Sequence, residues 1–148
     1  MIDWGGLMFK KILVAIGGSE DASETVPVVV YLAKALDADV FVVHMRERIV
    51  TSVATFEAET IPESFQFGEE IVRQLVMAGV KARSDIDSAR PEHLAAFILA
   101  KADEFGADLI VVGSHHAHGL RDRMFGDIGK ALAHGSRCPL LLMPSSLD

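Results

Sequence analysis

Cysteine is nearly absent from the sequence, with Cys138 the single example among 148 residues. One cysteine excludes an internal disulfide, and chains this poor in cysteine are typical of reducing compartments. Long apolar runs are also missing, since no stretch approaches the roughly 20 residues that a membrane-spanning helix needs. The first residues lack the basic start and apolar core of a secretory signal. We therefore expect a cytoplasmic protein with no membrane partner.

Basic residues are in deficit. The sequence contains 14 Lys and Arg against 21 Asp and Glu, a formal net charge of −7. Nucleic-acid binding depends on basic groups that displace counterions from phosphates, so this balance argues against a nucleic-acid partner. Half of the residues are hydrophobic, which excludes intrinsic disorder. A chain of this length buries one sizeable core, and we expect one domain over residues 9–148 behind an extension, residues 1–8, to which we assign no function.

Five short runs with strand character alternate with amphipathic segments along the domain. The runs span 11–16, 39–45, 80–87, 108–113 and 139–144. Helices are expected to begin near Ser19, Pro62, Pro91 and Asp127, where capping residues, prolines or first-turn acids precede an apolar face. The remaining stretch, 46–61, has no sustained periodicity and is interpreted as a mobile connection. This alternation predicts an α/β fold, a five-stranded doubly wound parallel sheet with helices on both faces, in which the half-polar run 80–87 forms an edge.

Ligands of such sheets bind at the carboxyl ends of the strands, where the strand order reverses. The positions to inspect are therefore 16–19, 44–46 and the segment that begins at Gly113. His44 lies inside an apolar strand and has no neighbouring nucleophile or orienting partner in the sequence. We interpret it as a hydrogen-bonded buried or pocket-rim histidine rather than a general base.

The segment 113–127 reads G-S-H-H-A-H-G-L-R-D-R-M-F-G-D and joins the fourth expected strand to a helix. Glycine lets a ligand approach the main chain, and free N–H groups at a helix start attract anions. By position this is a phosphate site. The patterns G-x-x-x-x-G-K-[ST] and G-x-S-x-G are absent, and no G-x-G-x-x-G follows the first strand.

Five segments together carry a family resemblance. They are K-K-I-L-V-A-I-G-G-S-E at 10–20, V-F-V-V-H-M at 40–45, G-A-D-L-I-V-V-G-S at 106–114, L-R-D-R-M-F-G at 120–126 and R-C-P-L-L-L-M-P at 137–144. In these segments the sequence resembles the universal stress protein family. The resemblance implies a five-stranded α/β domain, Rossmann-like and adenine nucleotide alpha hydrolase-like. It also implies a homodimer formed by pairing the last strand, 139–143, with its counterpart.

The same resemblance implies an adenine-nucleotide pocket. Its residues would be Ala15, Ile16, Gly17, Met45, Val112, Gly113, Ser114, His116, Gly126, Asp127 and Ile128. The base would lie against Ala15, Ile16 and Met45, with the ribose and phosphates above the backbone of 112–114. The candidate cofactor is ATP or AMP.

Some family members bind ATP through G-x-x-G, nine residues, then G followed by Ser or Thr, and Gly113 and Gly126 match its first and last glycines. Three positions depart. The second glycine is His116, the Ser or Thr is Asp127, and the aspartate that members usually carry at the first strand's tip is Gly17. An N-capping Asp127 carboxylate would stand where the phosphate should go, and two unit charges about 4 Å apart cost about 4 kcal/mol near a surface. We predict weak or absent ATP binding at neutral pH.

Three histidines invite a metal interpretation, because His115, His116 and His118 fall within four residues. No cysteine or paired carboxylate accompanies them, and their spacing in a loop fixes no geometry. We interpret them as solvated or anion-facing side chains and predict no metal site.

Three functions stay open from the sequence. The first is a homodimeric stress-response regulatory module that acts through an unidentified protein partner, with a degenerate nucleotide pocket. The second is a nucleotide sensor in which ATP or AMP occupancy alters the dimer. The third is a slow ATPase, which is least supported because no general base or metal-binding carboxylate stands at a strand tip, where Gly17 occupies the obvious place. We therefore do not expect an enzyme.

Overall fold

The computed structural model describes residues 8–17, 19–50, 52–57, 60–89, 91–113 and 121–144. Its elements, in chain order, are β1 (Lys11–Ala15), α1 (Ser19–Leu36), β2 (Asp39–Val50), β3 (Thr55–Glu57), α2 (Ile61–Met77), β4 (Ala82–Ala89), a 3₁₀ turn (Pro91–His93), α3 (Leu94–Phe105), β5 (Leu109–Val112), α4 (Arg121–Gly135) and β6 (Leu140–Leu142). Of the expected N-terminal extension, 1–8, only Met8 belongs to the described residues.

The strand β1 lies at the centre of the sheet. It pairs with β2 on one side and β5 on the other, so that Leu13 lies between Phe41 and Ile110. β4 pairs with β2, and β6 pairs with β5, all in parallel orientation. The resulting order β4-β2-β1-β5-β6 confirms the predicted five-stranded parallel sheet. Within the described residues β4 pairs only with β2, which makes it an edge as predicted.

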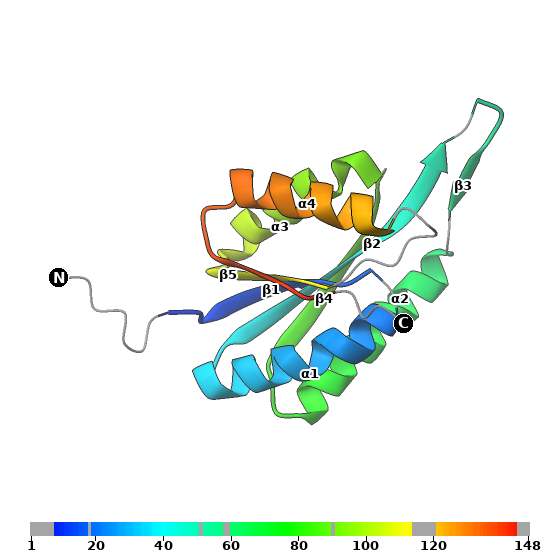
Figure 1. Ribbon diagram of the computed structural model, residues 1–148. Helices are drawn as coiled ribbons and strands as arrows, with labels where there is room; N and C mark the ends of the chain where they lie inside the picture. The colour runs from blue at the N-terminus through cyan, green and yellow to red at the C-terminus, as the bar shows by residue number, and fades with distance from the viewer. Residues whose placement is uncertain are drawn as a thin grey trace.

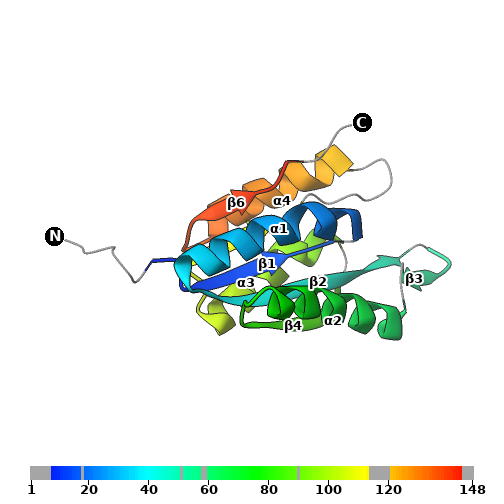
Figure 2. The same cartoon turned by 90° about the horizontal axis from the view of Figure 1, so that it is seen from below.

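Two hydrophobic layers cover the two faces of this sheet. α1 and α2 lie on one face and α3 and α4 on the other (Figures 1 and 2). Alternate residues of β1 supply both layers. Ile12 and Val14 pack in the layer under α1 and α2, whereas Leu13 and Ala15 pack in the layer under α3 and α4. This alternation explains why the strand reads as a continuous apolar run.

Asp108 ties the amino ends of β1 and β5 together. Its two carboxylate oxygens accept hydrogen bonds from the backbone N–H groups of Lys10 and Lys11, each at 2.9 Å. Its own N–H donates to the Lys11 carbonyl at 2.9 Å. Lys11 and Asp108 are 97 residues apart in the chain, so the central pairing of the sheet is a long-range contact.

The helix α2 confirms the expected start near Pro62 and adds a cap that the sequence analysis missed. The Thr60 hydroxyl accepts from the Glu63 N–H at 3.2 Å, and the Glu63 carboxylate accepts from the Thr60 N–H at 2.9 Å. This reciprocal pair is a capping box. The apolar side chains of Phe65 and Val76 are each 54% exposed. The buried positions of this helix are Ser64, Gly68, Ile71 and Leu75. Two of them, Ser64 and Gly68, are small residues that let the helix approach the sheet closely.

A projecting hairpin replaces much of the expected mobile connection. β2 continues to Val50 instead of ending near Met45, and β3 pairs with its last residues in antiparallel orientation. The interpretation of 46–61 is therefore wrong over this stretch. The β-branched residues Ile49, Val50 and Thr55 favour extended backbone, a signal that the search for periodicity overlooked. The hairpin extends well beyond the neighbouring strands (Figures 1 and 2).

The start of α4 also differs from the prediction. The helix begins at Arg121 rather than Asp127, so the backbone of Asp127 lies inside the helix and its predicted N-capping role is wrong. Arg and Met are good helix formers, which favours the earlier start, and the interior Gly126 costs only about 1 kcal/mol.

Candidate functional site

The strand order reverses between β1 and β5, and the two strands end at the same edge of the sheet. Three backbone hydrogen bonds tie this edge together. The Gly113 N–H donates to the Ala15 carbonyl at 2.9 Å, the Ile16 N–H to the Val43 carbonyl at 3.1 Å, and the Met143 N–H to the Val112 carbonyl at 2.9 Å. Such a switch point is where open α/β sheets bind ligands.

His44 fixes the turn that follows β1. Its Nδ1 lies 2.8 Å from the Ile16 carbonyl oxygen. A carbonyl oxygen only accepts, so Nδ1 carries a proton and donates. The ring is 3% exposed and packs against Phe67 of α2, with ring centroids 4.6 Å apart and planes inclined at 53°. The residue is a buried, hydrogen-bonded histidine, as the sequence analysis interpreted it.

Four of the candidate pocket residues meet at the switch point and are buried: Ala15, Ile16, Val112 and Gly113. Gly17, which follows them at the tip of β1, is half-buried. Since these side chains are small, absent or packed into the core, the switch point offers a ligand mainly backbone groups. The side chains that distinguish one ligand from another must come from other segments.

The other candidate residues are placed differently. Met45 continues β2, and Gly126 and Asp127 lie in α4. Ile128 is 7% exposed and belongs to the hydrophobic layer under α3 and α4, so the structure gives it a packing role. The candidates Ser114 and His116, with the neighbouring His115 and His118, lie outside the described residues.

The described residues contain neither a group of metal-binding side chains nor a membrane-spanning helix. Among those residues, no three His, Cys, Asp or Glu side chains are grouped so that they could hold a metal ion. No described helix is both long enough and apolar enough to cross a bilayer.

Sequence reasoning missed the contact between His44 and Phe67. Phe67 lies in α2, 23 positions after His44, and no motif links the two residues. The one signal was indirect. α2 lies in the connection between the paired parallel strands β2 and β4, and such a connecting helix covers a face of the sheet.

Comparisons with known proteins agree with this fold. A model of the "Universal stress protein family" matches residues 8–144. The universal stress protein YxiE of Bacillus subtilis is 31% identical, over 92% of this chain and 99% of that protein. A solved structure of a family protein from Burkholderia pseudomallei is 23% identical with a TM-score of 0.71, covering 94% of this chain and 98% of that one.

A second solved structure has a bound ligand. It is a universal stress protein family protein from Arabidopsis thaliana with AMP bound, 18% identical with a TM-score of 0.61 and covering 94% of each chain. At this level of identity the likeness concerns the fold. The family model and the relative from Bacillus subtilis go further, and they show that this chain belongs to the universal stress protein family.

Proposed function

We propose that this stress-response protein is a homodimeric regulatory module whose nucleotide pocket has lost much of its affinity for ATP. The observation that carries the proposal is the composition of the switch point. The backbone of Ala15, Ile16 and Gly113 is held by hydrogen bonds in one arrangement, whereas the sequence departs at the side chains expected to hold phosphate. The scaffold is retained and the phosphate contacts have changed.

The departures act through charge and shape. A carboxylate at Asp127 replaces a hydroxyl, and it repels a triphosphate wherever the helix begins. Because α4 begins at Arg121, Asp127 does not cap this helix, but its negative charge remains. His116 puts a side chain where a glycine would let phosphate reach the main chain. Gly17 replaces a carboxylate expected at the tip of β1.

The proposed dimer rests on β6. Leu141 and Leu142 are 36% and 40% exposed, and within the described residues the strand pairs only with β5. Backbone N–H and C=O groups of such an edge are open to a second strand. Pairing of two β6 strands would join two sheets and cover these leucines. A regulatory module of this kind acts through an unidentified protein partner.

A second function, an adenine-nucleotide sensor, is favoured by the AMP-bound protein from Arabidopsis thaliana. AMP carries less charge than ATP and so meets less repulsion from Asp127. In this alternative, AMP occupies the switch point and changes the dimer or its partner surface.

Thermal melts distinguish the two functions. The wild-type protein, the double variant Asp127→Ser with His116→Gly, and Asp103→Ser as a matched surface control are melted with ATP, AMP, adenosine or no ligand at pH 6 and pH 8. A ligand at about 100 times its Kd stabilises by about 2.7 kcal/mol, which raises the Tm by several degrees. We expect ATP to shift the double variant and to leave the wild type and the control unchanged. An equal shift of all three proteins by ATP would refute the degenerate pocket, and a wild-type shift by AMP alone would establish the sensor.

A further inference from the structure

A second cluster of chemistry-bearing side chains lies at the opposite, amino-terminal edge of the sheet. Its residues come from β1, β2, the start of β4 and the end of α3. In register, Lys11 pairs with Asp39, and Phe41 pairs with Arg83. Lys81 stands next to this row, because its carbonyl accepts from the Val40 N–H at 2.8 Å. Lys11, Asp39, Phe41 and Arg83 are all directed toward the face that α3 covers, because alternate residues of a strand share a face.

Arg83 is stacked on two aromatic rings. Its guanidinium carbon lies 4.7 Å from the centroid of Phe41 and 5.4 Å from that of Phe105. The rings of Phe41 and Phe105 are themselves stacked, 5.1 Å apart with planes at 27°. The negative faces of the rings attract the guanidinium, and its N–H groups can still pair with an anion. No ion pair or hydrogen bond occupies these N–H groups among the described residues.

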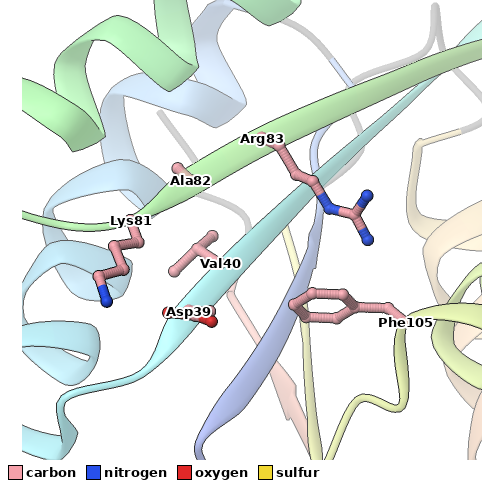
Figure 3. Close-up of a pocket in the computed structure, with 6 residues that line it drawn as sticks. All are labelled: Asp39, Val40, Lys81, Ala82, Arg83 and Phe105. Carbon is pink, nitrogen blue, oxygen red and sulfur yellow. The ribbon is translucent and has the colours of Figure 1, made fainter.

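A small cavity of about 180 Å³ lies beside Arg83 (Figure 3). Its lining residues are Asp39, Val40, Lys81, Ala82, Arg83 and Phe105. Phe105 provides the apolar surface, while Asp39, Lys81 and Arg83 supply charge. Val40 and Ala82 also border the cavity, but their side chains pack in the layer under α1 and α2. We call it the amino-edge pocket. Its volume equals that of about six water molecules and is smaller than that of pockets for drug-sized ligands. It lies at the amino ends of the strands, so it is distinct from the switch point, where the carboxyl ends of β1 and β5 meet.

The local charge of the amino-edge pocket opposes that of the whole protein. Its lining residues Lys81 and Arg83 stand against Asp39, a formal sum of 2 − 1 = +1, whereas the chain carries −7. Lys11 is held over the aromatic floor, since its Nζ donates to the Phe105 carbonyl at 3.3 Å and lies 5.5 Å from the ring centroid. The pocket therefore attracts a small anion.

We propose that the amino-edge pocket binds a small planar organic carboxylate. The carboxylate pairs with the N–H edge of Arg83, whose two-donor geometry matches it, and Lys81 adds a second charge. The flat apolar part of the ligand lies against Phe105. The aromatic surface favours an organic carboxylate over an inorganic anion as the ligand, because a fully hydrated ion gains nothing from contact with apolar surface.

Benzoate is a suitable probe, and benzamide is its neutral counterpart of the same shape. We expect two-dimensional amide NMR of the full chain to show saturable shifts with benzoate at millimolar concentration, confined to Lys81, Ala82, Arg83 and Phe105. Benzamide should bind at least about tenfold more weakly. Equal shifts with benzamide, stronger binding of inorganic phosphate, shifts scattered over the surface, or no saturation would each refute the proposal.

Variants assign the effect to the stacked guanidinium. Arg83→Met keeps an apolar stem over Phe41 and should weaken benzoate at least about tenfold, whereas Arg73→Met, a matched exposed arginine on α2, should not change it. Lys81→Met should weaken benzoate by a smaller factor and gives a second readout if Arg83→Met fails to fold. Unchanged affinity in Arg83→Met or Lys81→Met would overturn the proposal. Because the pocket lies at the other edge of the sheet, these results are independent of nucleotide binding.

Discussion

The two edge strands of the sheet, β4 and β6, differ in the kind of side chain that they carry. β4 has eight residues and carries charge on alternate positions. Its Asp85 forms an ion pair with Lys101 of α3 at 2.5 Å, and its Arg83 lies over aromatic rings. β6 has three residues, all leucine, two of them substantially exposed. Charged residues keep a strand edge from pairing with another chain, whereas exposed apolar side chains on an edge invite it.

Edge chemistry, rather than edge position, therefore favours β6 over β4 as the proposed interface. Both strands lie at the rim of one sheet, and each has a helix packed against it. α2 packs on β4 and α4 packs on β6. The two strands differ in the free energy needed to remove water from their exposed side chains. This cost is high for the charged groups of β4 and low for the leucines of β6. The following experiments test that contrast.

The largest effect is expected at β6. Leu141→Asp places a charge in the proposed dimer interface and should raise the dimer Kd at least about 100-fold, or about 2.7 kcal/mol. Sedimentation equilibrium measures it, with Asp87→Ser on β4 as the control that leaves assembly unchanged. The proposed difference between β6 and β4 would be refuted if the wild-type protein sedimented as a monomer, or if Leu141→Asp left the dimer Kd unchanged.

A smaller effect is expected where the two helices approach the edges. An added Cβ at Gly68 of α2 would lie 2.8 Å from Ile86 Cδ1 and 3.4 Å from Ser84 Oγ on β4, whereas one at Gly129 of α4 would meet, among the described residues, Leu142 Cδ1 alone at 3.3 Å. Overpacking in Gly68→Ala should cost about 1 to 2 kcal/mol, offset in part by the roughly 1 kcal/mol that alanine gains over glycine inside a helix, so the variant should be less stable than wild type.

Gly129→Ala is the matched control on the β6 side. It should be neutral or stabilising by up to about 1 kcal/mol, because alanine favours helix and the leucine end can move. Urea denaturation measures both variants. Equal effects at the two glycines would mean that α2 is no more tightly packed on β4 than α4 is on β6.

The smallest effect concerns the ion pair on β4. The hydrogen bond from Lys101 to Asp85 raises the pKa of Lys101 above its usual value of 10.5. A raised folded-state pKa stabilises the fold below the unfolded pKa, and the contribution is lost as pH rises through the folded pKa. Lys101→Met should cost about 0.5 kcal/mol at pH 8, a modest value because Asp85 is 40% exposed.

As the pH rises through the folded-state pKa of Lys101, the stability difference between Lys101→Met and wild type should shrink toward zero, since the ammonium of the wild type titrates. Lys34→Met, an exposed lysine of α1, serves as the control with no difference at either end of this pH range. A Lys101→Met deficit that stays constant over this range would show that packing, rather than the ion pair, accounts for the loss.

The strands of this protein were predictable wherever local sequence decided them. β1 and β5 are buried on both faces, so their positions read as unbroken apolar runs. Gly106 ends α3 with a φ of 74°, a conformation that glycine adopts without strain. The switch-point residues of the candidate site followed from the same logic, because topology alone brings the tips of β1 and β5 together.

The failures arose where tertiary contacts or weak local signals decide the outcome. β2 extends as a hairpin because β3 pairs with it, and such pairing is not written in either segment alone. The amino-edge pocket was missed because Phe41, Arg83 and Phe105 are distant in sequence and meet only through register. Asp127 was misassigned because capping residues also occur inside helices when strong formers precede them.

The central place of β1 has a consequence for the protein as it is being made. β1 emerges early from the ribosome, but the partner strand that closes its second edge begins about 97 residues later, as the Lys11–Asp108 contact shows. At roughly 5 to 20 residues per second, that wait is about 5 to 20 seconds. Until then the nascent chain holds an apolar strand paired on one side only, and translation speed over this stretch governs how long it is open to aggregation.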